Sequence, residues 1–166
     1  EVYSRLLKGF DFAEVIDLGA GVNGFSYDYF PAKMNYLAIE GVGQLVNLMN
    51  NYFEKKRING LAIHESLLEL EKIKKIIKEI KKPKIVFLFK TLDSLEMLKR
   101  DYSKELLLEI TPLVDRIVVS FATRSMVSKK KFKVSRNWIT DFIKDNFKII
   151  DDFEMGDERY LVFGKR

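Results

Sequence analysis

The sequence contains no cysteine, one histidine and three prolines among its 166 residues. Without cysteine, disulfides, thiolate metal sites and cysteine nucleophiles are excluded, and we expect an intracellular, cytoplasmic setting. No apolar run reaches the roughly 18 residues that a membrane-spanning helix needs, and no signal peptide is visible. We therefore predict neither a membrane partner nor a metal site.

Apolar material, in contrast, is abundant enough for a sizeable core. Hydrophobic residues make up 47% of the chain, and its length fits one domain. We therefore predict a single domain over residues 1–166. Because the first residue is Glu1 rather than methionine, two origins stay open: a trimmed chain, or a start inside a longer protein.

The chain is modestly basic, with 29 Lys+Arg against 24 Asp+Glu and a formal net charge of +5. Such an excess fits a polyanionic partner, but it also fits an ordinary solvated surface. Six cations cluster near Phe132 and Trp138: Arg124, Lys129, Lys130, Lys131, Lys133 and Arg136. Positive charge interleaved with aromatic rings favours RNA binding, and a solvated loop is the alternative.

Apolar runs alternate with helical periodicity along the chain. We expect strands at 14–18, 36–40, 58–63, 84–89, 116–121, 147–153 and 159–163. We expect helices at 42–53, 65–82, 94–110 and 134–145. The alternation predicts a mostly parallel sheet with helices on both faces, and Gly156-Asp157 predicts a C-terminal antiparallel hairpin. This α/β arrangement of seven strands resembles the Rossmann-like class I methyltransferases.

The strongest motif, Asp17-Leu18-Gly19-Ala20-Gly21, follows the first expected strand. Glycines at this point let the backbone approach a ligand closely. Together with Gly24 they match G-x-G-x-x-G, which cradles a pyrophosphate in dinucleotide sites. Asp17 would repel a pyrophosphate but suits the amino group of a methionine moiety. The motif therefore favours S-adenosylmethionine as the cofactor.

Three further side chains follow the next strands. Glu40 ends the second strand, where a carboxylate accepts ribose hydroxyls, although NAD sites use the same device and a solvated acid is the alternative. Glu65 either accepts a hydrogen bond from the adenine amine or only begins a helix. His64 is a candidate for the wall of an adenine pocket, but a structural or exposed histidine is more common. It is not predicted to be a catalytic base.

Three segments resemble motifs of the Arm/FmrO group of aminoglycoside-resistance ribosomal RNA methyltransferases. They are Lys90-Thr91-Leu92, Ser120-Phe121-Ala122-Thr123-Arg124-Ser125 and Glu158-Arg159-Tyr160-Leu161-Val162-Phe163. In the family turn D-L-x-x-G-x-N-P, Asn23 matches the asparagine and Gly24 replaces the proline. Ala122 replaces the proline of the family motif S-F-P-T-[KR]-S.

The resemblance implies S-adenosylmethionine-dependent methylation of a guanine N7 in small-subunit ribosomal RNA. Together with the residues argued from the strand ends, it predicts a cofactor site made of Asp17, Gly19, Ala20, Gly21, Asn23, Glu40, His64, Glu65, Ser66 and Lys90. It also places Lys90 beside the methyl-transfer point, and Arg124 and Ser125 toward the target nucleotide. The family has an N-terminal RNA-binding extension, and Glu1-Val2-Tyr3 resembles the helix that follows it. Two alternatives stay open here: the extension was removed from this chain, or the chain is a reduced homologue.

Two other functions stay open at this point. A small-molecule methyltransferase would share the cofactor motif without binding RNA, and a non-catalytic module would keep only the fold. No residue of the sequence is a plausible general base. Guanine N7 needs none, because its lone pair is already nucleophilic and catalysis can consist of positioning. A sequence without a general base is thus compatible with methylation of guanine N7, and the basic cluster and the family motifs favour the RNA methyltransferase.

Overall fold

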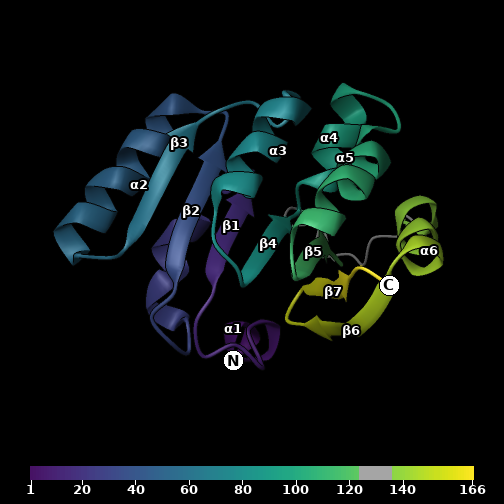
Figure 1. The fold of residues 1–166 in the computed structure, drawn as a ribbon, viewed down its shortest axis with the longest axis horizontal. Coiled ribbons are helices and arrows are strands. Elements are labelled where there is room, and N and C mark those ends of the chain that lie inside the picture. Colours follow the sequence, from purple (N-terminus) through teal and green to yellow (C-terminus); the bar gives the residue numbers. More distant parts are fainter. Residues whose placement is uncertain (124–135) are drawn as a thin grey trace.

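The alternation of apolar runs and amphipathic helices produces a seven-stranded sheet (Figure 1). The computed structural model describes residues 1–123 and 136–166. The strands are β1 (Glu14–Leu18), β2 (Asn35–Glu40), β3 (Gly60–His64), β4 (Lys84–Phe89), β5 (Arg116–Ala122), β6 (Lys148–Met155) and β7 (Glu158–Gly164). The helices are α1 (Val2–Leu6), α2 (Gly43–Lys56), α3 (Leu70–Glu79), α4 (Leu92–Leu98), α5 (Tyr102–Ile110) and α6 (Asn137–Asn146), with 3-10 turns η1 (Asn23–Tyr29) and η2 (Thr111–Leu113).

The strand order is β3-β2-β1-β4-β5-β7-β6. The pairs among β1 to β5 are parallel, and β7 is antiparallel to both β5 and β6. The predicted fold class, a mostly parallel sheet with a terminal antiparallel hairpin, is therefore confirmed. Because the order reverses between β1 and β4, their carboxyl ends border the crevice in which open sheets of this class bind ligands.

Two apolar cores, one on each face of the sheet, fill the space between the sheet and its helices. One core includes buried residues of α3, α5 and α6, and the other includes residues of α1, η1 and α2 (Figure 1). The central strand β4 contributes to both cores, since Ile85 and Phe87 face one and Val86 and Leu88 face the other. Burial on both faces explains why its sequence is a continuous apolar run.

Several element boundaries differ from the expected ones. The helix expected at 94–110 is two helices, because the backbone is extended at Lys99 and left-handed at Asp101, with φ of 61°. The amide of Asp101 binds the Glu96 carboxylate at 2.6 Å instead of continuing a helical ladder. The helix expected at 65–82 begins only at Leu70, after a turn. The third strand begins at Gly60 rather than residue 58.

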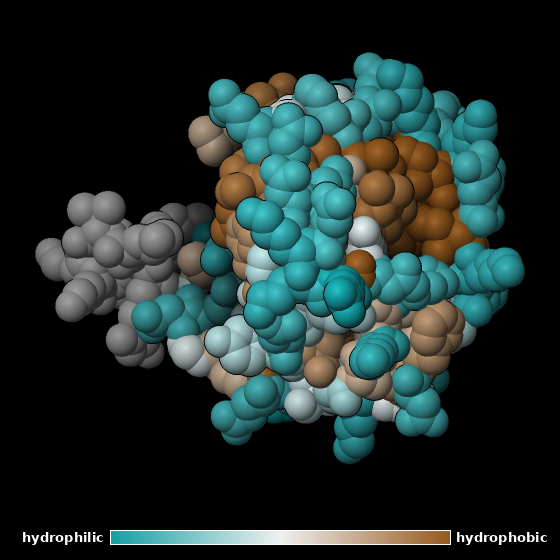
Figure 2. All heavy atoms as spheres, turned by 90° about the vertical axis from the view of Figure 1, so that its left-hand side faces the viewer, coloured by the Kyte–Doolittle hydropathy of each residue, from teal (hydrophilic) through white to brown (hydrophobic). Residues whose placement is uncertain are grey.

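The edge strand β3 has the backbone groups of one residue, Ala62, covered by a side chain. The side chain of Asn50, from α2, donates to the carbonyl of Ala62 at 2.9 Å and accepts from its amide at 2.8 Å. Figure 2 shows this side of the molecule, where hydrophilic side chains border a hydrophobic area, and Leu61 of β3 is exposed. Within 1–123 and 136–166, no helix is long and apolar enough to cross a membrane.

Candidate active site

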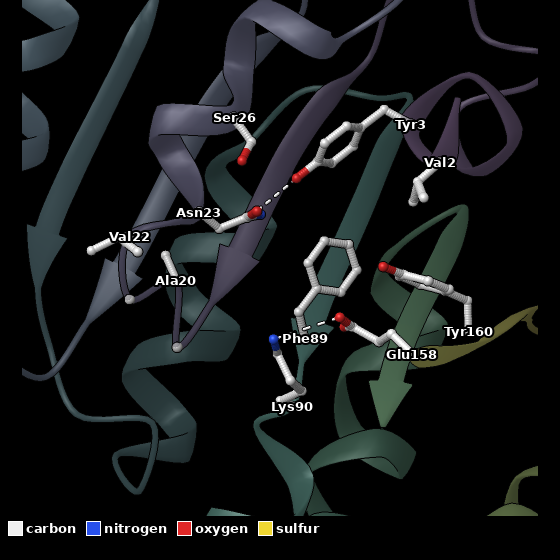
Figure 3. A pocket seen from close by; sticks show the side chains of 12 residues that line it. Val2, Tyr3, Ala20, Val22, Asn23, Ser26, Phe89, Lys90, Glu158 and Tyr160 are labelled. Carbon is white, nitrogen blue, oxygen red and sulfur yellow. Dashed lines mark hydrogen bonds and ion pairs between the residues drawn. The ribbon is translucent and has the colours of Figure 1, made fainter. Parts of the chain in front are cut away.

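A cavity of about 470 Å³ lies at the carboxyl ends of β1 and β4 (Figure 3). Its lining combines the glycine turn with side chains of α1, η1, β4 and β7: Val2, Tyr3, Gly19, Ala20, Gly21, Val22, Asn23, Ser26, Phe89, Lys90, Glu158 and Tyr160. Five of the residues predicted from the sequence therefore meet here, namely Gly19, Ala20, Gly21, Asn23 and Lys90.

Different structural constraints favour glycine at the three glycine positions of this segment. Gly19 and Gly21 both have positive φ, 72° and 55°. A Cβ on Gly19 would lie 2.9 Å from Thr91 Cγ2, whereas a Cβ on Gly21 would meet nothing within 4 Å. Gly24 serves packing instead, because a Cβ there would lie 2.8 Å from the ring of Phe53. Gly21 thus presents bare backbone beside open space, which is what a close ligand contact requires.

Glu40, at the end of β2, stands beside this turn. Its Oε2 accepts the amide of Gly21 at 2.7 Å, and its Oε1 accepts the amide of Val42 at 2.9 Å. The side chain is buried, so these bonds fix its orientation. Each oxygen has more than one acceptor site, and the predicted role toward ribose hydroxyls is compatible with this arrangement.

Asp17 lies behind the cavity wall. Its Oδ2 accepts from Asn23 Nδ2 at 2.6 Å and from the Tyr36 hydroxyl at 2.5 Å, while Oδ1 has no partner among the described residues. Burial raises the pKa of Asp17 to about 6, although the hydrogen bonds from Asn23 and Tyr36 oppose the rise. The fully buried carboxylate is linked to the cavity through Asn23. Direct contact with a ligand amino group stays a prediction.

This burial gives a pH dependence to folding. A carboxyl whose pKa is near 6 when folded and 3.8 ordinarily binds protons more tightly in the folded state. The contribution of Asp17 to stability is therefore largest below the unfolded pKa and is lost as pH rises through the folded one, by about 3 kcal/mol for a two-unit shift. We expect Asp17→Asn to lack this fall when urea unfolding is measured from pH 4 to 7. Parallel pH profiles for the two proteins would contradict the assignment.

Lys90 and Glu158 form an ion pair at the cavity. Lys90 has a positive φ of 55°, held by its amide, which donates to Ser120 O at 3.1 Å. Its Nζ lies 3.5 Å from Glu158 Oε2, and the Ser120 hydroxyl donates to Glu158 Oε1. Strained backbone of this kind in a non-glycine residue is found preferentially at functional sites. The Glu158 carboxylate, on β7, is thus held by Ser120 of β5 and by Lys90, which directly follows β4. Figure 3 shows the pair of Lys90 and Glu158.

Aromatic rings form the apolar part of the cavity. Phe89 stacks on Phe87 at 4.6 Å between centroids and meets Tyr160 edge-on at 5.9 Å. The hydroxyl of Tyr3, from α1, donates to Asn23 Oδ1 at 2.6 Å. No role for these rings or for Glu158 is predicted from the sequence. Glu158 and Tyr160 lie in a segment that carries the family resemblance, and Tyr3 lies in Glu1-Val2-Tyr3, which resembles the family's helix before the first strand, but neither resemblance predicted a contact with the site.

His64 ends β3, Glu65 and Ser66 follow it, and none of the three lines this cavity. The exposed His64 has its Nε2 2.9 Å from Gly41 O. Glu65 accepts the amide of Ser66 at 2.9 Å, which lowers the pKa of its carboxyl. Its own amide donates to Glu40 O at 3.2 Å, so the segment adjoins the Glu40 end of the turn. The adenine-binding roles of these residues stay predictions.

Most of the predicted RNA-binding residues lie outside the described residues: Arg124, Ser125, Lys129, Lys130, Lys131 and Lys133. Arg136 is described, and its side chain is only 16% exposed. It donates to Asp93 Oδ2 at 2.8 Å and to Ala122 O at 3.0 Å, tying β5 to α4. Its RNA contact stays a prediction. Among the described residues, no acidic or histidine cluster could hold a metal ion.

Comparison with solved structures identifies proteins of the same fold. The 16S rRNA methyltransferase RmtF, solved in complex with S-adenosyl-L-homocysteine, matches with a TM-score of 0.77 and 23% identity, over 99% of this chain and 61% of that one. The 16S rRNA methylase ArmA matches with a TM-score of 0.73 and 19% identity, over 99% and 81%. The 16S rRNA methylase RmtB matches with 0.72 and 18%, over 99% and 61%.

This chain thus spans about three fifths of the length of RmtF and of RmtB. A scan against protein-family models finds no match, and a search of curated proteins finds none either. At these identities the likeness establishes the fold, that of the 16S rRNA methyltransferases.

Proposed function

We propose that this domain is an S-adenosylmethionine-dependent RNA methyltransferase that acts on a guanine N7 of small-subunit ribosomal RNA. The observation that carries the proposal is the composition of one cavity. A bare glycine turn braced by Glu40 forms one wall, and the Lys90–Glu158 ion pair stands on the other. The solved complex of RmtF with S-adenosyl-L-homocysteine, on the same fold, supports the cofactor assignment.

The residues present fit this cofactor. Gly21 offers open space without a side chain, and Glu40 offers oriented carboxylate oxygens for ribose hydroxyls. Asn23, anchored to Asp17, offers a fixed polar group near the methionine end. When bound, S-adenosylmethionine supplies an electrophilic methyl group. The chain's own contribution is to hold both reactants in line and to exclude water, which lowers the barrier by positioning.

The other half of the cavity suits a guanine. The aromatic rings of Phe89 and Tyr160 provide surfaces for packing a base that has left its stack. A carboxylate accepts hydrogen bonds from N1–H and the 2-amino group of guanine, and a neighbouring ammonium donates to O6. Glu158 and Lys90 provide this pair of groups 3.5 Å apart. Adenine has an acceptor at N1 in place of the N1–H donor of guanine, so it would not donate a hydrogen bond from N1 to the carboxylate.

The basic cluster provides the expected contact with the RNA backbone. Replacing Lys129, Lys130 and Lys131 together with glutamine should weaken RNA binding and lower its salt-dependence slope by roughly 2, at about 0.7–0.9 per phosphate contact. The matched control replaces three exposed lysines of and just after α3: Lys75, Lys78 and Lys81. Binding isotherms at several salt concentrations would measure both. Equal slopes for the two triple variants would identify the cluster as a solvated loop.

The test of the function is methylation of small ribosomal subunits with labelled cofactor, followed by mapping of the modified nucleotide. We expect label at a guanine N7 in the RNA. Label confined to a small molecule would favour the small-molecule methyltransferase, and cofactor binding without transfer would favour a non-catalytic module. These experiments use a protein that includes any segment preceding Glu1, because such a segment could contribute to RNA affinity.

A further inference from the structure

The helix that precedes β1 is held in place by tertiary packing. In folded proteins most helical stability comes from packing rather than from local propensity, and α1 (Val2–Leu6) packs on the sheet through its last turn. Leu6 and Leu7 are buried against the sheet. The position of α1 therefore depends on the tertiary contacts that hold it.

Two arginines supply polar anchors for α1. Arg116, the first residue of β5, donates through Nη1 to Leu6 O at 2.7 Å and to Lys8 O at 3.0 Å. These carbonyls belong to the C-terminal end of the helix, where intrahelical partners run out. Arg5 of α1 binds both carboxylate oxygens of Asp151, at 2.7 and 2.9 Å. The helix is thus fastened at the amino end of β5 and along β6.

The other end of α1 builds the cavity wall. Val2 and Tyr3 line the cavity (Figure 3). The Tyr3 ring packs on Phe30 at 4.7 Å, and its hydroxyl holds the side chain of Asn23, which in turn holds Asp17. A contact made at the amino end of the sheet is therefore connected, through one short helix, to the glycine turn at the carboxyl end.

We infer that docking of α1 is coupled to cofactor binding, and that Arg116 is a positioning residue for the cofactor site although it does not touch the cavity. The inference rests on the proposed function, because it takes this cavity as the cofactor site. A cofactor that binds only when α1 is docked stabilises the docked helix, and by linkage a weakened anchor lowers cofactor affinity.

The test measures the dissociation constant for S-adenosylhomocysteine by calorimetry. Arg116→Met should raise it about tenfold, within the usual 5–150-fold range of coupled sites, and Arg116→Lys should restore part of the affinity. Lys84→Met is the matched control, because Lys84 Nζ donates to Ile77 O at 2.6 Å at the end of α3. The control should lose thermal stability without losing affinity, since α3 contributes no residue to the cavity.

A second readout needs no variant. The amide of Leu7 donates to Tyr3 O at 2.9 Å, so its hydrogen exchange reports on the docked helix. Adding S-adenosylhomocysteine to the wild type should slow this exchange, and unchanged exchange would overturn the inference. An unchanged dissociation constant in a folded Arg116→Met protein would overturn it too. Failure of the wild type to bind the compound is a different result, and it would overturn the proposed function together with this inference.

Discussion

Gly21→Val is expected to abolish cofactor binding while the domain still folds. The Cβ position is open, so a Cβ at residue 21 does not collide with the protein, and a larger side chain would occupy space beside the cavity that Gly21 lines. The positive φ of 55° adds strain of about 1–2 kcal/mol. Any shift of the turn would also loosen the 2.7 Å bond from the Gly21 amide to Glu40.

We expect the dissociation constant for S-adenosylhomocysteine to rise by about 100-fold or more, since overpacking alone costs about 1–3 kcal/mol. Gly156→Val is the matched control. Gly156 also has a positive φ, 64°, and open space around its Cβ position, but it does not line the cavity. Thermal unfolding should show similar losses for the two variants, and calorimetry should show lost binding only for Gly21→Val. Wild-type affinity in Gly21→Val, or binding of NAD in place of S-adenosylhomocysteine by the unaltered protein, would contradict the cofactor assignment.

The fold was predictable because each element leaves a local signature. The apolar run at 84–89 is buried on both faces, and the glycine motif follows a strand directly, so period and spacing were sufficient. The predicted ends of helices were wrong where tertiary contacts override local propensity. The chain breaks at Asp101, whose amide binds Glu96, and the next residue, Tyr102, is buried and bonds to Leu67 O. Helical periodicity carries no information about such a contact.

Only part of the site was predictable from the sequence, namely the residues that lie close together along the chain. Gly19, Gly21 and Asn23 belong to one motif, and their neighbourhood follows from the sequence. The other half is assembled from a distance: the Ser120–Glu158 bond joins residues 38 positions apart, and Tyr3 bonds to Asn23, 20 positions away. A pattern of residues along the chain does not show which strand ends converge, so these partners required the structure.

Glu158 belongs to this long-range half of the site. Glu158→Gln is expected to lower the single-turnover methylation of small ribosomal subunits by about 100-fold, the loss that misplacing a reactant by about 1 Å causes. Glutamine retains an acceptor for the Ser120 hydroxyl but presents an amide where the carboxylate faces Lys90 and, in our proposal, the guanine N1–H. Affinity for S-adenosylhomocysteine should stay near that of the wild type, because the turn and Glu40 are unaltered.

Lys90→Met should produce a loss of similar size, and the double variant should lose little more, because the two groups act as one unit. Lys99→Met is the control: Lys99 lies 3.2 Å from Glu105 in an exposed pair of similar geometry, and exposed pairs contribute about 0–1 kcal/mol. If Glu158→Gln methylated the subunits at the wild-type rate, the Lys90–Glu158 pair would have only a structural role, that of linking the end of β4 to β7. If cofactor affinity fell in proportion to the rate, the pair would belong to the cofactor site, and recognition of the base would rest on other residues.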